Sequence, residues 1–356
     1  MENQNQENIK LPYITEGVEG IGGKIKENTE SFVVEEVPVY ECSGEGEHLF
    51  INITKENLTT KEVCDKLKEI FNLKWEDIGT AGLKDKNAKT TQTISLRFGN
   101  FNGINIDEIK EKIENEFSGK LKVNWMKKHS NKLKSGHLLG NNFKIKVLEL
   151  DCDIEEAEKR AEKIIEKIKE RGLPNYYGEQ RFGKNQDNWS EGLAVLRGEK
   201  KIYDKWMRKF LLSSVQSYLF NIYLSERIKR GWFDKLLAGD IAKKTDTGGL
   251  FYVEAENLEK EQERFDKKEI VFTGPMYGEK LMEAREKSGE FEKEILNKFN
   301  LSEKELKWLG GTRRQGKLIV NEISFEIDES KTAIWFSFFL PKGSFATVLL
   351  RELMKN

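Results

Sequence analysis

The segment from Ala81 to Gln92, AGLKDKNAKTTQ, contains an aspartate, Asp85, between two lysines, Lys84 and Lys86. Nearby cations favour the ionised form of a carboxyl group, so Asp85 is expected to be an anion at neutral pH. Such a carboxylate can attack an electrophilic carbon or accept a proton. A lone aspartate in a glycine-containing loop more often makes an Asx turn or a capping bond, and the segment alone favours that structural interpretation.

A second segment with chemical potential is LPNYYGEQRFG, residues 173–183. Here Asn175 offers an amide, and Tyr176 and Tyr177 offer rings with hydroxyl groups. These side chains could stack on a nucleic-acid base and bond to its edge. They could equally pack inside the protein, and the residue types alone favour packing.

A third segment, residues 117–148, contains no aspartate or glutamate but eight lysines and two histidines. Lysines neutralise phosphates and thereby drive polyanion binding without sequence preference. The candidate RNA contacts in this stretch are Lys127, Lys128, Lys132 and Lys134. A solvated lysine-rich strand and loop explains the same composition equally well.

The whole chain has 356 residues and a net charge of −1, so no global basic field indicates a nucleic-acid partner. Its three cysteines form no CxxC pair and its three histidines no HExxH motif, which leaves no sequence basis for a zinc ribbon or a metal centre. No run of about 18–20 apolar residues predicts a membrane helix. The polar start of the chain lacks a signal core, and we expect a cytoplasmic protein without metal.

Hydrophobic periodicity predicts a mixed α+β body interrupted by a more helical region from about 184 to 315. The first twenty residues are polar and are expected to fray. A capping box at Thr59–Glu62 opens one helix, and Asp153 caps another that Gly172 ends. A polar loop is predicted for 81–92. The predicted strands are 23–26, 32–39, 48–55, 93–98, 143–150, 317–320, 323–327 and 333–340, and the other predicted helices are 106–117, 203–229, 279–299 and 345–354.

Several of these segments resemble the motifs of one family. AGLKDKNAKTTQ is similar to the signature around the catalytic aspartate of the tRNA pseudouridine synthase D (TruD) family. PNYYGEQRFG resembles its second signature, which usually has Phe at the position of Tyr177. Residues 26–36 with SGEGEHL (43–49) resemble its first block, although Thr29 and Ser31 replace the common Pro and Asp. LPKGSFATVLLREL (340–353) resembles its closing block, and the family order is preserved.

The resemblance implies a pseudouridine-synthase mixed sheet in a discontinuous catalytic domain, residues 1–174 and 316–356, with an α/β insertion domain at 175–315. It implies that Asp85 is catalytic. The implied uracil-pocket residues are Phe32, Asn175, Tyr177 and Phe345, with Lys26 and Lys84 as basic residues near the site. The implied substrate is tRNA, commonly at uridine 13.

The implied reaction detaches uracil from C1′, turns it and rejoins it through C5, and it needs no cofactor and no metal. The carboxylate could attack the sugar as in retaining glycosidases, or it could remove the C2′ proton to give a glycal, and the sequence leaves both routes open. A tRNA-binding protein or chaperone of the same fold without activity is the alternative function. We expect a monomer, since nothing indicates a coiled coil.

Overall fold

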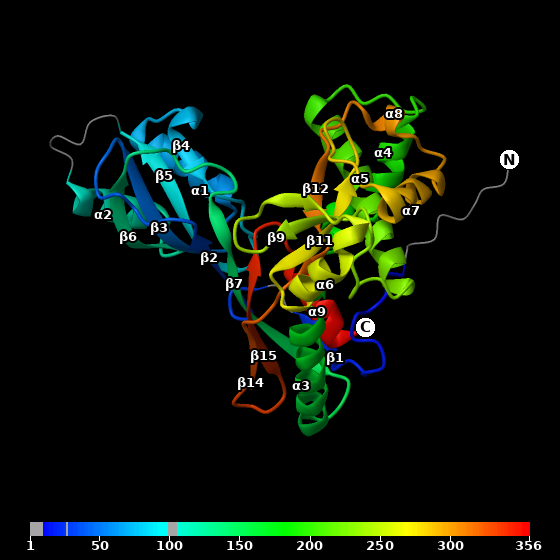
Figure 1. The fold of residues 1–356 in the computed structure, drawn as a ribbon. Helices are drawn as coiled ribbons and strands as arrows, with labels where there is room; N and C mark the ends of the chain where they lie inside the picture. Colours follow the sequence, from blue (N-terminus) through cyan, green and yellow to red (C-terminus); the bar gives the residue numbers. More distant parts are fainter. Residues whose placement is uncertain (1–9, 26–27, 99–104) are drawn as a thin grey trace. The chain divides into compact units, whose positions relative to one another are not determined.

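The computed structural model describes residues 10–25, 28–98 and 105–356 (Figure 1). Its contacts divide the chain into two compact units. The sheet unit comprises residues 21–161 and 322–343 together with Asn356, and the helical unit comprises residues 1–20, 162–321 and 344–355. The chain therefore passes between the units several times. Each unit is described by itself.

One mixed sheet organises the sheet unit, with the strand order β14-β15-β7-β2-β5-β3-β6; β1 also pairs with β7, and β4 with β5. β2 and β5 run parallel, whereas the other pairs are antiparallel. The strands are β1 (Gly22–Ile25), β2 (Phe32–Pro38), β3 (His48–Glu56), β4 (Ile78–Thr80), β5 (Lys89–Arg97), β6 (Leu121–His129), β7 (Leu138–Leu150), β14 (Ile323–Ile327) and β15 (Ile334–Pro341).

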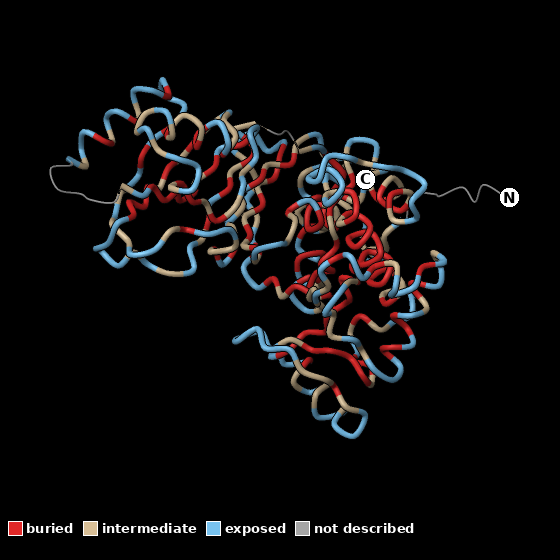
Figure 2. The backbone as a smooth tube through the Cα atoms, turned by 90° about the horizontal axis from the view of Figure 1, so that it is seen from above, coloured by how far each residue is buried: buried red, intermediate tan, exposed pale blue. Residues whose placement is uncertain are grey.

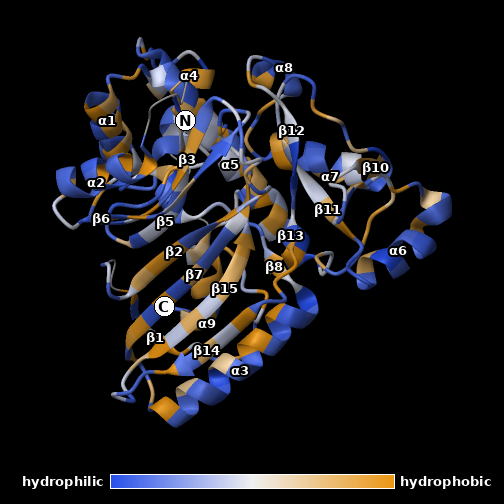
Figure 3. Ribbon diagram, turned by 90° about the vertical axis from the view of Figure 1, so that its left-hand side faces the viewer, coloured by the Kyte–Doolittle hydropathy of each residue, from blue (hydrophilic) through white to orange (hydrophobic). Residues whose placement is uncertain are grey.

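The long strand β7 joins the N-terminal and C-terminal parts of this sheet. Along its length it pairs with β2, with β15 and with β1, and Figure 3 shows β2, β7 and β15 side by side. Its inward residues Ile145 and Val147 are fully buried. The strand β15, which the sequence predicts only from its apolar run, is thus placed in the sheet by pairing with β7.

Two helices, α1 (Thr60–Phe71) and α2 (Ile106–Glu116), pack beside β3, β5 and β6 (Figure 1). Val63 and Leu67 of α1 and Ile113 of α2 share a core with Ile51 and Ile94 of the strands. Both members of the predicted capping box are present at the start of α1. Thr60, the first residue of this helix, accepts a hydrogen bond from the Lys84 amide and so ties the helix to the loop between β4 and β5 that carries Asp85.

Helix α3 (Ile154–Arg171) contributes its first residues to the sheet unit and residues 162–171 to the helical unit. The side chain of Asp153 accepts a hydrogen bond from the Glu156 amide at 2.9 Å, as its predicted capping role requires. Gly172 follows with φ of 78°, a left-handed conformation that glycine adopts without strain. Polar and apolar residues alternate along the helix in Figure 3.

The helical unit is built around α5 (Lys205–Lys229), most of whose residues from Leu211 onward are buried. A four-stranded sheet, β10-β9-β11-β12, and a two-stranded pair, β13-β8, complete the unit. The other elements of this unit are α4 (Asn188–Leu196), α6 (Leu258–Asp266), α7 (Glu286–Asn297), α8 (Glu303–Leu306), α9 (Ala346–Met354), β8 (Leu173–Pro174), β9 (Ile241–Lys244), β10 (Leu250–Tyr252), β11 (Ile270–Met276), β12 (Thr312–Gln315), β13 (Lys317–Leu318) and the 3₁₀ turns η2 (Glu179–Phe182) and η3 (Ala255–Asn257). A further 3₁₀ turn, η1 (Trp75–Asp77), belongs to the sheet unit.

The N-terminal segment differs from the expectation of fraying, as far as it is described. Ile14 and Thr15 are buried, and their amides donate to the fully buried carboxylate of Glu352 at 3.1 and 3.2 Å. The Thr15 hydroxyl donates to the same carboxylate at 2.8 Å. Figure 2 shows buried stretches within the body and exposed connecting loops. A partner more than 330 residues away therefore orders this segment.

Most predicted elements are present with shifted ends. The strand predicted from Thr93 begins at Lys89, because residues 89–91 pair with both β2 and β3. The predicted domain limits at 175 and 315 stay a prediction. In the described part of the chain, no helix has the length and apolar character needed to cross a bilayer.

Candidate active site

Asp85 is exposed, and it lies in the loop that precedes β5. The loop is held on both sides of this residue. The Lys84 amide donates to the Thr60 hydroxyl at 2.9 Å, and the buried ammonium group of Lys55 donates to the Asp85 carbonyl at 3.1 Å. Lys86 forms an ion pair with Glu62 at 3.2 Å. The structure therefore presents a carboxylate on an anchored backbone.

Lys84 has a different partner from the one that the sequence suggested. Its ammonium group forms a buried ion pair with Glu36 of β2 at 2.7 Å. The other oxygen of Glu36 accepts from the Thr93 amide at 3.2 Å. The charge of Lys84 is thus balanced by Glu36, and its visible role is to tie the Asp85 loop to the sheet.

The buried cation coupled to Asp85 is Lys55, which the sequence interpretation missed. Burial lowers the pKa of Lys55 to about 8, and attraction to the Asp85 carboxylate opposes part of this shift. Its ammonium group also donates to the Leu58 carbonyl at 2.5 Å. A sequence signal existed: in β3, Ile51 and Ile53 are buried, and alternation places Lys55 on the same face.

Three further candidates lie together in the helical unit. The rings of Tyr177 and Phe345 lie 5.7 Å apart at an angle of 57°, and both side chains are half-buried. The Tyr177 amide donates to Asn221 at 2.8 Å, and its hydroxyl contacts the Met276 sulfur at 3.6 Å. The Tyr177 hydroxyl therefore has a hydrogen-bond partner.

Asn175, the third of these candidates, is buried and already has partners for its amide. Its nitrogen donates to the Gln315 carbonyl at 2.9 Å, and its oxygen accepts from Arg314 at 2.6 Å. Arg314 also donates to the Asn175 carbonyl and lies 4.0 Å over the Tyr177 ring. Asn175 thus positions Arg314 against Tyr177. The contact between Asn175 and Arg314 could not be predicted from the sequence, because the two residues lie 139 positions apart.

The remaining predicted residues lie in the sheet unit or outside the described residues. Phe32 is buried at the start of β2, and Lys26 lies outside the described residues. The four candidate lysines of the basic stretch lie in β6 and in the turn before β7. Lys127 and Lys134 are exposed, Lys128 and Lys132 are half-buried, and the Lys132 ammonium donates to the Glu76 carbonyl at 2.6 Å.

The position of β6 at the edge of the sheet gives its lysines a second explanation. Edge strands expose unpaired backbone groups, and charged side chains on them prevent pairing with other chains. Nearby, His129 stacks on Tyr40 at 5.1 Å and accepts from the Ser43 amide, while His137 bonds to the Tyr40 hydroxyl at 2.9 Å. Both histidines are thus engaged in local structure.

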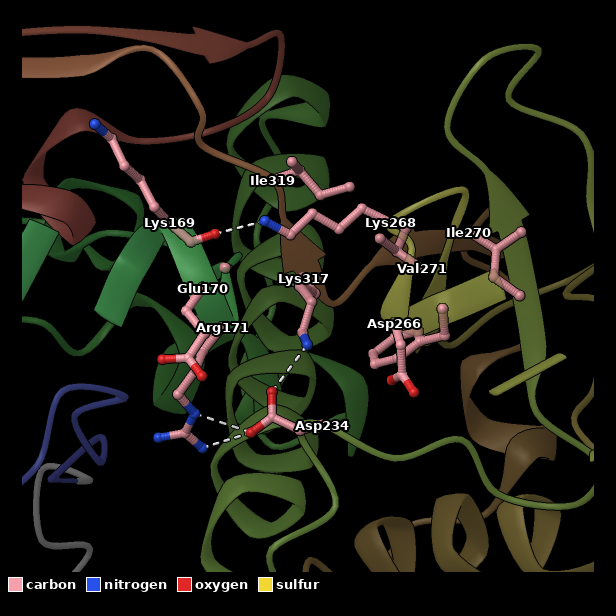
Figure 4. Close-up of a pocket in the computed structure, with 12 residues that line it drawn as sticks. Lys169, Glu170, Arg171, Asp234, Asp266, Lys268, Ile270, Val271, Lys317 and Ile319 are labelled. Carbon is pink, nitrogen blue, oxygen red and sulfur yellow. Dashed lines mark hydrogen bonds and ion pairs between the residues drawn. The ribbon is translucent and has the colours of Figure 1, made fainter. Parts of the chain in front are cut away.

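A cavity of about 400 Å³ lies in the helical unit (Figure 4), and none of the predicted site residues lines it. At its wall, Asp234 accepts two bonds from Arg171, at 2.9 and 2.7 Å, and one from Lys317 at 2.9 Å. Burial lowers the pKa of Lys317. These groups satisfy one another and link α3, the segment after α5, and β13.

Comparison with known protein families shows which family the chain belongs to. The sequence pattern of the tRNA pseudouridine synthase D (TruD) family matches residues 8–203 and 200–353. The chain belongs to this family. The family and the isomerase activity predicted from the motifs are thereby confirmed, and the two matched ranges together span most of the chain.

Curated relatives agree along nearly the full length. One tRNA pseudouridine synthase D from Thermus thermophilus is 38% identical over 346 residues, which cover 97% of this chain and 92% of the relative. The protein of the same name from a Nitratiruptor species is 34% identical and covers 92% of this chain and 93% of the relative. The match therefore includes both compact units.

The fold matches a crystal structure of a Methanosarcina mazei protein assigned to the same family. The TM-score is 0.76 at 24% sequence identity, with 98% of this chain and 99% of that chain covered. The predicted fold class, α+β with a mixed sheet, is confirmed.

Proposed function

We propose that this protein isomerises a uridine of tRNA to pseudouridine, with Asp85 as the reacting carboxylate on a nucleotide flipped out of its stack. The observation that carries the proposal is the exposed Asp85 on a loop anchored by Thr60, Lys55 and the Lys84–Glu36 pair. Within a family of pseudouridine synthases, an accessible carboxylate on a fixed backbone is the arrangement that attack on a bound sugar requires.

The reaction balances without an external reagent. The bond from N1 to C1′ breaks, a bond from C5 to C1′ forms, the proton on C5 is lost and N1 gains one. Asp85 either forms a temporary bond to C1′ or removes and returns the C2′ proton, and both routes need a short anionic side chain. The proposal requires no metal and no redox cofactor.

The target base must leave the RNA stack to reach a carboxylate, at a cost of about a few kcal/mol. Ring contacts offset this cost. Tyr177 and Phe345 form an existing ring pair, and Phe32 is the candidate in the sheet unit. Asn175 supports the Tyr177 ring through Arg314, because its own amide is engaged.

The proposed position is uridine 13 of tRNA. The test uses tRNA transcripts with tritium at C5 of uridine, incubated with purified protein in buffer without nucleotide, flavin or added metal. We expect tritium release from the wild-type transcript and none from a transcript in which position 13 is cytidine. Equal release from both transcripts would contradict the position, and no release from any tRNA would contradict the function.

A further inference from the structure

Three aromatic rings and two guanidinium groups lie next to one another in a continuous series within the helical unit. Trp206 and Phe210, one turn apart on α5, stack with ring centroids 5.4 Å apart and planes inclined by 3°. The Arg181 guanidinium lies 5.4 Å from the Phe210 ring and 5.9 Å from the Tyr177 ring. Arg314 covers Tyr177 at 4.0 Å. The five side chains come from three separate segments of the chain.

The two arginines of this series lack an acidic partner among the described residues. Arg181 donates to the hydroxyls of Ser217 and Ser213 at 3.1 and 2.7 Å, and Arg314 donates to Asn175. Burial lowers the pKa of each guanidinium, Tyr177 opposes part of this shift in both, and Arg181 adds a smaller lowering of the pKa of Arg314. Two partly buried cations that repel each other would be stabilised by a bound anion such as a phosphodiester.

The outer end of the series is both aromatic and basic. Trp206 is 68% exposed although Phe210 covers part of its indole, and the nearby Tyr203 is 91% exposed. Residues 200–209 include five basic residues, of which Lys200 pairs with Glu191 at 3.0 Å, and one acidic residue, Asp204. The Asp204 carboxylate caps α5 by accepting from a backbone amide of its first turn at 2.6 Å. This surface thus combines a stacking platform with an excess of positive charge.

We propose that Trp206, Phe210, Arg181, Tyr177 and Arg314 form a track for an unpaired stretch of RNA. A base stacks on the free face of Trp206, and the arginines receive phosphates. Stacking rings with interspersed cations are the usual means of holding single-stranded nucleic acid, whereas an apolar protein partner would not require the excess of basic residues. The choice of RNA over other polyanions rests on the proposed function.

The test is a titration of the full-length protein with a fluorescently labelled ten-nucleotide oligoadenylate. Trp206→Ala is expected to raise the Kd by roughly 5- to 150-fold, the range of one lost base stack. Trp308→Ala is the matched control, because Trp308 is 89% exposed in the same unit. Its Kd should stay within about twofold of the wild-type value, as expected for a side chain outside the interface.

Two further variants separate stacking from general apolar contact. Trp206→Phe should retain most of the affinity, and Trp206→Leu should lose it. The inference is overturned if Trp206→Ala binds like the wild type, if Trp308→Ala weakens binding equally, or if Phe and Leu behave alike. If the wild-type protein is a dimer in the absence of RNA and the Trp206→Ala variant is a monomer, this face is a protein–protein contact. That result would also overturn the inference. The oligoadenylate contains no uridine, so failure of the proposed isomerisation leaves this test unaffected.

Discussion

At the scale of single residues, the site combines one accessible carboxylate with neighbours whose charges are already paired. Asp85 is exposed, whereas Lys84 and Glu36 neutralise each other in the interior. Asp85 and Tyr177 could be proposed from the sequence because each lies within a contiguous signature. The Lys84–Glu36 and Asn175–Arg314 contacts could not be predicted, because they join residues 48 and 139 positions apart in the chain.

Tyr177→Phe tests whether the ring or the hydroxyl matters. The hydroxyl donates to the Met276 sulfur, which is a weak acceptor, so the phenylalanine variant should keep kcat/KM within about threefold of the wild-type value. Tyr177→Ala removes the ring and should lower kcat/KM by roughly 10- to 100-fold. Kinetics of pseudouridine formation on tRNA provide the measurement, and equal losses in the two variants would assign the role to the hydroxyl.

At the scale of elements, the Asp85 loop is positioned by α1 and by strands β2, β3 and β5. The capping box that begins α1 was predictable because it depends on residues three apart. The early start of β5 was not predictable from the sequence, because it arises from pairing with β2 and β3. Lys55 is the intermediate case: alternation along β3 places it inside, but its contact with the Asp85 backbone depends on the tertiary fold.

The buried charge of Lys55 predicts a pH dependence of stability. Its folded-state pKa is about 8, below the ordinary value of 10.5. Below pH 8 both folded and unfolded chains carry the proton, and the cost of burying the charge is fully present. Between about pH 8 and 10.5 the folded chain releases the proton first, so this cost declines and stability rises.

The measurement compares the free energy of unfolding by denaturant for the wild type and Lys55→Met at about pH 7, 8, 9 and 10. The wild-type value should rise relative to that of the variant as the pH increases from about 8. A difference between the two proteins that stays constant over this range would show that Lys55 does not titrate there.

At the scale of the whole molecule, each unit has its own core. In the helical unit, Arg227 and Asp240 form a fully buried ion pair at 2.6 Å, and Ser288 donates to the same carboxylate at 2.6 Å. Asp240→Ala leaves the Arg227 charge buried without its partner and should reduce the free energy of unfolding by about 3–5 kcal/mol. Denaturant unfolding measures this change, and a loss below about 1 kcal/mol would contradict it.

The basic stretch concerns binding by the molecule as a whole. Replacing Lys127, Lys128, Lys132 and Lys134 by alanine should weaken tRNA binding and reduce the slope of log Kd against log salt by up to roughly one unit per phosphate contact. Lys132 already donates to a backbone carbonyl and is expected to contribute least. An unchanged salt slope would leave only the edge-strand explanation for these lysines.

The most direct measurement is a single-turnover reaction with enzyme in excess over tRNA, followed by analysis of the nucleosides. Asp107→Asn serves as the control, because Asp107 is an exposed carboxylate of the same unit. Asp85→Asn should bind tRNA yet form pseudouridine at least roughly 10⁴-fold more slowly than the wild type. Asp107→Asn should react at the wild-type rate. Pseudouridine formation by Asp85→Asn within about tenfold of the wild-type rate would contradict the role of this carboxylate.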